Sequence, residues 1–155
     1  MAKFTMLNSQ KFDELMSRFS NMEGNTDAVC EKALTAAGEV VEEKVRENLK
    51  GVIGKNLKVD GRSTGELLES LGTSPMLVDA NGNYSVKVGF NEPRREKASK
   101  GASYKEVTNA MIGSVIEYGK AGQPPKPFMK PALLSVKNKA KDKMKEVLEE
   151  EFDKL

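Results

Sequence analysis

Apolar residues recur three or four positions apart in two long stretches, and this spacing predicts two long helices. The first covers about residues 26–49 and starts at a threonine, a residue type that caps helices. The second covers about residues 132–154 and follows Pro131, which fits the first turn of a helix. A shorter stripe after Ser9 predicts an N-terminal helix that ends at Gly24. The stripes are Phe12, Leu15, Met16 and Phe19; Val29, Ala33, Ala36, Ala37, Val40, Val41 and Val45; and Leu133, Val136, Ala140, Met144, Val147, Leu148 and Phe152.

The alanines of the first long stripe make a flat face that permits close contact with another helix. We interpret this face as part of the core of the subunit rather than as a dedicated interface. The acidic residues between the apolar positions are then left for solvent or for a neighbour.

The middle of the chain is predicted to contain a β-hairpin. Residues 76–78 and 84–90 have the apolar character of strands, and the second segment alternates apolar and other residues. Between them, Asn81 is followed by Gly82, which is a strong turn signal.

Two shorter helices are predicted around this hairpin. Ser63 and Glu66 have the spacing of a capping box, which predicts a helix over residues 65–71. Residues 107–118 also have a helical pattern, followed by Gly119 at the position of a C-terminal cap. A strand remains the competing interpretation for residues 111–118, because Ile112, Val115 and Ile116 are β-branched. The predicted inward face of this helix is Ala110, Met111, Ser114, Val115 and Tyr118.

Two polar, glycine-containing segments, residues 51–62 and 91–105, are predicted to be mobile loops. The second is a basic insertion that we expect to be disordered or to be ordered by a partner. Its basic residues are candidates for contact with DNA phosphates. They are Arg94, Arg95, Lys97 and Lys100.

Four prolines fall within eight residues just before the last helix and exclude both a helix and a central strand there. We expect an extended, stiff connector. Phe128 within it either packs inside its own subunit, which we favour, or anchors a neighbouring subunit. Glu117, at the end of the preceding helix, is either a buried, hydrogen-bonded carboxylate that holds the turn or a solvated charge. The prolines are Pro124, Pro125, Pro127 and Pro131.

Together these elements predict one α+β domain over residues 1–155. A small antiparallel sheet, formed by the hairpin and one or two further strands, would pack against the alanine-rich helix and the C-terminal helix. The N-terminal helix, within residues 1–25, would be peripheral.

Composition argues against an enzyme. The chain of 155 residues contains no histidine and one cysteine, Cys30, so His-dependent triads and the usual zinc and iron sites are excluded. Neither GxxxxGK[ST] nor GxGxxG occurs, so we expect no nucleotide or other cofactor. No apolar run is long enough to span a membrane, and the N-terminus lacks the pattern of a signal peptide. A single cysteine suits a reducing compartment.

Charge along the last helix is segregated, although the net charge of the chain is only +2. Lysines occupy the first half and acids the end, which opposes the helix dipole. Either solvent screens this arrangement, or the basic half of one subunit faces the acidic half of another. The residues are Lys137, Lys139, Lys141, Lys143 and Lys145, followed by Glu146, Glu149, Glu150, Glu151 and Asp153.

Three motifs in order give the chain a family resemblance. They are STGELLES at residues 63–70, VIEYG at residues 115–119 and PKPFMKPAL at residues 125–133, the last leading into the final helix. Together with the preceding alanine-rich helix, these motifs resemble the tail-completion or neck proteins of long-tailed double-stranded DNA bacteriophages. The resemblance is firmest over residues 63–155.

This resemblance implies a non-enzymatic structural protein that makes a phage tail competent to join a DNA-filled head. Its partners would be copies of itself in a ring-like oligomer, a tail terminator and head-completion or connector proteins, with non-specific contact to packaged DNA and none to a membrane. It would be found in the virion, and in the host cytoplasm during assembly. The candidate interface residues are Phe128, Pro127, Pro131, Glu117, Gly119, Lys137, Lys139 and Lys141.

Two other functions fit parts of the sequence. A nucleic-acid-binding module would use the basic loop and the lysine row, but the small net charge and the absence of a recognised binding motif count against it. A carboxylate-dependent hydrolase would need two acids close together in a cleft, and the sequence indicates no such pair.

Overall fold

The computed structural model describes residues 17, 26–54, 65–91, 93–95 and 106–154. Within them the chain has the predicted α+β composition, with two long helices, two short ones and three small antiparallel sheets. The elements in chain order are α2 (Thr26–Val52), α3 (Glu66–Glu69), β1 (Leu71–Thr73), β2 (Leu77–Val78), β3 (Tyr84–Ser85), β4 (Val88–Phe90), β5 (Pro93–Arg95), β6 (Glu106–Thr108), α4 (Asn109–Tyr118) and α5 (Met129–Phe152).

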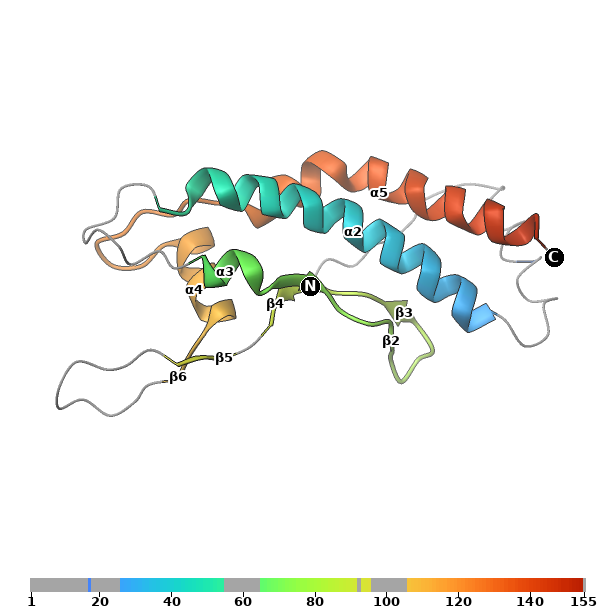
Figure 1. Cartoon of the computed structure of the whole chain (residues 1–155), viewed down its shortest axis with the longest axis horizontal. Helices are drawn as coiled ribbons and strands as arrows, with labels where there is room; N and C mark the ends of the chain where they lie inside the picture. Colours follow the sequence, from blue (N-terminus) through green and yellow to red (C-terminus); the bar gives the residue numbers. More distant parts are fainter. Residues whose placement is uncertain (1–16, 18–25, 55–64, 92, 96–105, 155) are drawn as a thin grey trace.

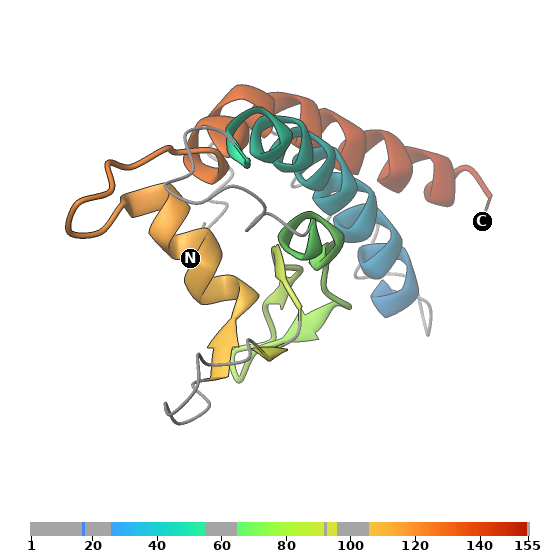
Figure 2. The same ribbon diagram turned by 60° about the vertical axis from the view of Figure 1, so that its left-hand side comes forward.

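The two long helices, α2 and α5, lie side by side and form one layer of the molecule, as Figures 1 and 2 show. The alanine-rich stripe of α2 faces inward, so its interpretation as a core face is confirmed. Ala33 and Ala37 are buried on this stripe, and Ala132 and Ala140 are buried on α5. These small side chains let the helices approach closely while Val45 and Leu49 fill the space below them.

The shorter elements form a second layer beneath the helices (Figure 1). The side chain of Arg46 on α2 connects the two layers. Its guanidinium donates hydrogen bonds to the carbonyl oxygens of Leu68 at 2.8 Å and Leu71 at 2.9 Å. It also pairs with Glu42 at 2.8 Å, whose second carboxylate oxygen accepts from the Thr73 hydroxyl at 2.8 Å. These contacts fix the end of α3 and strand β1 against α2.

The predicted hairpin is confirmed. Strands β2 and β3 pair antiparallel, with Leu77 opposite Ser85 and Val78 opposite Tyr84. The carboxylate of Asp79 accepts backbone N–H groups of the turn, which stabilises it as an Asx turn.

The predicted strand over residues 84–90 is divided in the structure. Its first part, β3, pairs with β2, whereas β4 pairs with β1, with Leu71 opposite Phe90. The division occurs at Lys87, whose N–H donates to the hydroxyl of Ser74 instead of to a strand carbonyl. The same two arms of the chain pair on both sides of this point, but the register shifts by one residue, so they form two separate two-stranded sheets.

Several predicted boundaries differ from the structure. Helix α2 continues to Val52, so the predicted loop at residues 51–62 starts too early. Helix α3 is capped by Gly65 and ends at Glu69, because β1 already begins at Leu71. Ser63 and residues 55–62 lie outside the described residues, and of the predicted N-terminal helix only Ser17, which is helical, lies within them.

Helix α4 is a helix and not the competing strand, but its predicted inward face is wrong. Met111 and Tyr118 on that face are 56% and 75% exposed. The buried residues are instead Asn109, Gly113 and Glu117. The helix begins after Thr108, the last residue of β6. The hydroxyl of Thr108 caps the helix by accepting a hydrogen bond from the N–H of Met111.

Gly113 explains why this face turns inward. A Cβ atom at this position would lie 2.4 Å from the Phe90 ring, so only glycine permits the observed approach of α4 to β4. The apolar side chains of Ile112 and Ile116 flank the glycine and pack on the core. Gly113 therefore allows α4 to turn this face toward Phe90. The spacing of the apolar residues alone predicted a different orientation of the helix.

The polar segment of residues 91–105 is not wholly irregular. Residues 93–95 form β5, which pairs antiparallel with β6, so that Arg94 lies opposite Val107. The expectation of a loop throughout this segment is therefore wrong at residues 93–95, and residues 96–105 lie outside the described part of the chain. Strand β6 (Glu106–Thr108) includes the predicted start of the helix over residues 107–118, which begins at Asn109 instead. Among the helices described, none has the length and apolar character needed to cross a membrane.

We predict that Gly113→Ala lowers stability although alanine favours helices. The clash with Phe90 costs about 1–3 kcal/mol, which outweighs the gain in helix propensity of about 1 kcal/mol. Gly51→Ala is the matched control, because it lies in α2 and a Cβ there would meet no atom within 4 Å. Denaturant melts of both variants test this prediction. A stabilised Gly113→Ala protein would contradict the packing account.

Candidate functional site

The end of α4, the proline-rich connector and the start of α5 are joined by one carboxylate. The side chain of Glu117 is buried and accepts three backbone N–H groups from the beginning of α5. The donors are Phe128 at 2.7 Å, Met129 at 2.8 Å and Lys130 at 3.0 Å. Of the two interpretations left open for Glu117, the buried and hydrogen-bonded carboxylate is the observed one.

This arrangement gives each backbone N–H group in the first turn of α5 a hydrogen-bond acceptor. The first N–H groups of a helix have no partner within the helix. Phe128, the residue before the helix, makes no side-chain cap, so another group must accept these hydrogen bonds. The next residue, Pro131, has no N–H to satisfy. The single carboxylate of Glu117 therefore serves every donor of this turn, and its charge also suits the positive end of the helix dipole.

The pKa of Glu117 reflects two opposing effects. Burial raises the pKa of this carboxyl, because it disfavours the charged form. The three backbone N–H groups and the nearby Lys130 ammonium favour the charged form, and together they outweigh burial. The pKa of Glu117 is consequently lowered from its ordinary value of 4.5, and the carboxylate stays ionised around neutral pH.

Gly119 turns the chain at the end of α4. Its φ of 76° lies in the left-handed region, and a Cβ there would lie 2.7 Å from the carbonyl oxygen of Gln123. Its N–H donates to Val115, so the residue closes the helix as predicted. Further along the chain, the N–H of Lys126 donates to the carbonyl oxygen of Ile116 at 2.7 Å. This hydrogen bond holds the connector against α4.

The ring of Phe128 is fully buried within its own subunit. It packs beside Phe90 with ring centroids 6.1 Å apart and an interplanar angle of 58°. The carbonyl oxygen of Phe128 accepts a hydrogen bond from the Asn48 side chain at 3.1 Å. This is the intrasubunit arrangement that we favoured from the sequence. In this structure the ring is not available to a neighbouring subunit.

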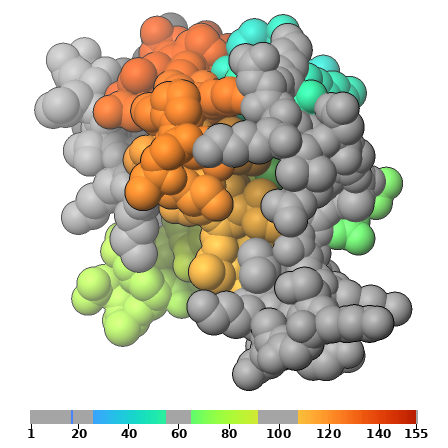
Figure 3. Space-filling view, turned by 90° about the vertical axis from the view of Figure 1, so that its left-hand side faces the viewer, coloured from blue at the N-terminus to red at the C-terminus, as the bar shows by residue number. Residues whose placement is uncertain are grey.

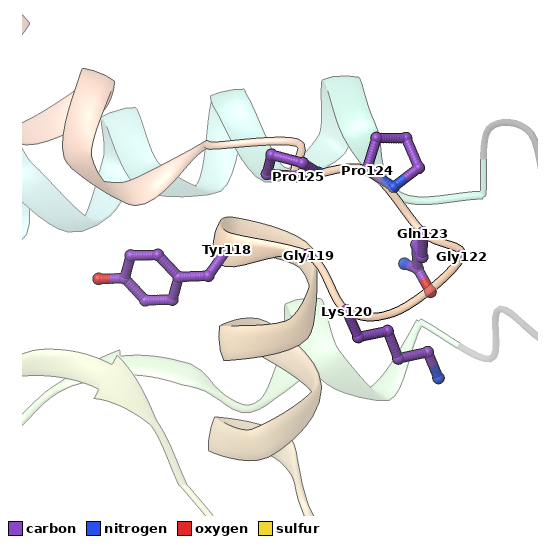
Figure 4. A pocket seen from close by; sticks show the side chains of 7 residues that line it. All are labelled: Tyr118, Gly119, Lys120, Gly122, Gln123, Pro124 and Pro125. Carbon is purple, nitrogen blue, oxygen red and sulfur yellow. The ribbon is translucent and has the colours of Figure 1, made fainter.

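A shallow hollow lies beside this junction. It is formed where the turn after Gly119 folds back on the connector, and Figure 4 shows the ring of Tyr118 extending away from the turn. The turn and the connector stand at the surface at this end of the molecule (Figure 3). The lining residues are Tyr118, Gly119, Lys120, Gly122, Gln123, Pro124 and Pro125.

The charges of α5 are only partly paired within the subunit. Lys143 pairs with Glu146 at 3.1 Å, and Lys145 pairs with Glu149 at 3.8 Å. Glu151 pairs with both Lys154 and, across the helix layer, Lys32 on α2. Several charges of the helix form no ion pair among the described residues. In the first half they include Lys137, Lys139, Lys141 and Asp142, and at the end they include Glu150 and the C-cap residue Asp153.

The family of the chain follows from its sequence match to a family model. The model described as "Bacteriophage HK97-gp10, putative tail-component" matches residues 13–119, which is more than half of the chain. The chain belongs to this family. Comparisons with curated proteins and with solved structures give no match.

Membership of the phage tail-component family makes the protein a component of a bacteriophage virion and favours a structural over a catalytic role. The matched range includes α2 and ends at Gly119, so the connector and α5 lie beyond it. Two of the three motifs used for the resemblance, residues 63–70 and 115–119, fall inside the match. The third is tied to them in space through Glu117.

The remaining candidate residues of this tail component that the structure describes come from separate elements. Pro127 and Pro131 are exposed beside the buried Phe128, so they shape the backbone around it. Arg94 and Arg95 lie in β5, whereas Lys97 and Lys100 lie outside the described residues. The structure does not bring Lys137, Lys139 and Lys141 to the Glu117 junction, which lies at the first turn of α5. The basic residues of the second loop and those of α5 therefore belong to different elements.

Sequence reasoning missed Asn48, Phe90 and Gly113 as parts of this junction. Gly113 carried a signal, because a glycine in mid-helix often marks close packing. Asn48 and Phe90 carried none, because their roles depend on contacts between segments far apart in the sequence.

We predict that Glu117→Gln lowers stability at neutral pH by about 1.5–3 kcal/mol, because hydrogen bonds to a charged acceptor are lost. Because the pKa of Glu117 is lowered in the folded protein, the loss of stability caused by this substitution depends on pH. The stabilising contribution is complete above the ordinary value of 4.5 and disappears as the pH falls through the lower value of the folded protein.

The stabilities of the Glu117→Gln variant and of the unaltered protein should therefore become more alike as the pH falls below 4.5. Glu39→Gln, at an exposed position of α2, is the control. Denaturant melts between pH 3 and pH 7, chosen to span that value, measure the difference. A difference that stays constant over this range would contradict the capping role.

We predict that Phe128→Ala destabilises the subunit by about 3–5 kcal/mol, because it leaves a cavity against Phe90. Leu134→Ala is the control, since Leu134 is exposed on the same helix. Thermal or denaturant melts compare the two variants. A normal melt of Phe128→Ala together with failed head–tail joining would show that the ring acts at an interface instead.

Proposed function

We propose that this protein is a tail-completion component, which assembles with copies of itself and makes the end of a phage tail competent to join a head. Family membership supports the tail location. The motifs at residues 63–70, 115–119 and 125–133 support the narrower role, because they resemble those of tail-completion and neck proteins. The proposed partners are further copies, the tail terminator and head-completion or connector proteins.

The observation that carries the self-assembly is the charge on the outer surface of α5. Lys137, Lys139 and Lys141 form no ion pair among the described residues, and neither do Glu150 and Asp153 at the other end of the helix. Opposite charges on one rigid helix are self-complementary when copies associate head to tail. Such charges fix register and exclude wrong partners more than they add affinity.

A head-to-tail contact of this kind joins two different surfaces of each copy. Repetition of the same contact closes into a ring when the rotation between neighbours divides a full turn. A ring suits the end of a tail, because a tail is a tube through which DNA passes. The Glu117 junction holds the start of α5 in place, so the charged surface is presented by a fixed element.

We predict that Lys139→Glu with Lys141→Glu weakens self-association and head–tail joining but leaves the melting temperature nearly unchanged. Both residues lie at least partly on the surface, where substitutions shift stability by about 0.5 kcal/mol or less. Glu150→Lys with Asp153→Lys should have the same effect from the other side. Light scattering and an in vitro head–tail joining assay measure the outcome.

Mixing the two double variants supplies the decisive comparison. In a mixed, alternating assembly every contact regains opposite charges, so equimolar mixing should restore association. Each variant mixed with wild-type copies is the control, because half of its contacts stay repulsive. If the two variants fail to rescue each other, the α5 charges do not form the contact between copies.

A nucleic-acid role is a second candidate, supported by the placement of two arginines. Strand β5 carries Arg94 and Arg95 at the base of the basic segment, and a protein around a DNA channel would place such residues near phosphates. Non-specific DNA binding at low salt that falls steeply as salt rises, and that Arg94→Ala with Arg95→Ala reduces, would favour it. Binding of this kind is compatible with the tail role.

A further inference from the structure

We propose that the β2–β3 hairpin of one copy docks on the outer face of α4 of the next copy. This inference rests on the proposed self-assembly and names the surfaces that would form a second part of the contact. It follows from the positions of apolar side chains that the folded subunit leaves exposed.

Large apolar side chains are exposed at few places among the described residues. Three of the six lie on the hairpin and two on the outer face of α4. Val78 and Tyr118, the most exposed of each group, are 56% and 75% exposed. Exposed apolar groups that cluster in this way mark interaction surfaces. The six are Leu77, Val78 and Tyr84 on the hairpin, Met111 and Tyr118 on α4, and Leu134 on α5.

The two apolar surfaces are separated along the long axis of the molecule. In Figure 1, α4 lies toward the left end and the hairpin lies to the right of β4 and β5. One subunit therefore cannot cover its own α4 with its own hairpin. Two different surfaces on one chain, both with exposed apolar side chains, are the requirement for a head-to-tail contact between copies.

The charges around the two surfaces are complementary. The only charged residue of α4 is Glu117, which is buried and engaged with α5, so the outer face of the helix carries no charge. The exposed Lys120 follows directly after this face. Between Leu77 and Ser85 the only charged residue is the acid Asp79 in the turn. An apolar hairpin with an acidic tip thus matches an apolar helix face bordered by a lysine.

The hairpin has a fixed position in the subunit. Beside its turn, the Tyr84 hydroxyl donates to Asp27 on α2 at 2.6 Å. A hairpin fixed before association loses less conformational freedom when it docks. On the receiving side, Tyr118 borders the shallow hollow that the following turn and the connector line (Figure 4).

Disulfide trapping tests this contact directly. In a Cys30→Ser background, which removes the native thiol, Val78→Cys combined with Tyr118→Cys should form disulfides between copies under mild oxidation. A head-to-tail contact then gives a ladder of covalent multimers on a non-reducing gel. Val78→Cys with Leu134→Cys is the matched control, since Leu134 is equally exposed but lies outside both surfaces, and it should give no ladder.

A second variant tests the contact without cysteines. Tyr118→Asp should weaken self-association at least about tenfold, because a charge would enter an apolar contact. Its melting temperature should stay unchanged, since the side chain is exposed in the subunit. Unweakened association of this variant would overturn the proposed contact.

The outcomes separate this inference from the proposed function. If light scattering shows oligomers but the Val78 and Tyr118 pair gives no ladder, the hairpin contact is wrong and self-assembly stands. If Tyr118→Cys alone gives covalent dimers, two α4 faces meet symmetrically and the hairpin is not the occupant. If the protein stays monomeric at every concentration and no ladder forms, both the contact and self-assembly are wrong.

Discussion

The carboxylate of Glu117 is the constraint on which the arrangement of the chain depends. It joins the last turn of α4 to the first turn of α5 through three backbone N–H groups. With this end of α5 fixed, Phe128 is buried against Phe90, and α5 is placed along α2. Loss of the carboxylate would leave buried donors without an acceptor, and such groups are costly in a folded protein.

Much of the fold could be predicted from residue patterns, because the long helices and the hairpin are encoded locally. The stripe of α2, the Asn81-Gly82 turn and the cap at Gly119 each act over a few residues. The orientation of α4 could not be predicted, because its buried residues are the polar Asn109 and Glu117 and the glycine Gly113, whereas Met111 and Tyr118 are exposed. Gly113 and Glu117 are inward for reasons that involve Phe90 and α5, which are distant in sequence. The sequence placed Glu117 and Phe128 among the candidates but did not show that they contact each other.

The subunit has a rigid junction around Glu117, and it has surfaces that stay exposed when it is alone. The junction uses the Glu117 and Phe128 side chains internally, so the charged outer side of α5 and the apolar outer side of α4 are left for partners. This division suits the proposed assembly of this phage tail component with further copies of itself. Tyr118 is therefore a better candidate than Phe128 for contact with another protein, because the ring of Tyr118 is exposed and that of Phe128 is buried.

The tie between Glu117 and α5 also means that the limit of family similarity is not the limit of the folding unit. The matched range ends at Gly119, two residues after the carboxylate whose three donors lie at residues 128–130. A fragment cut at that limit would keep the acid and lose every group that it binds. It would also uncover the side of α2 that carries Val45 and Leu49, which are fully buried in the whole chain. In this chain the segment after Gly119 must therefore bring the N–H groups that start α5 back to this acid.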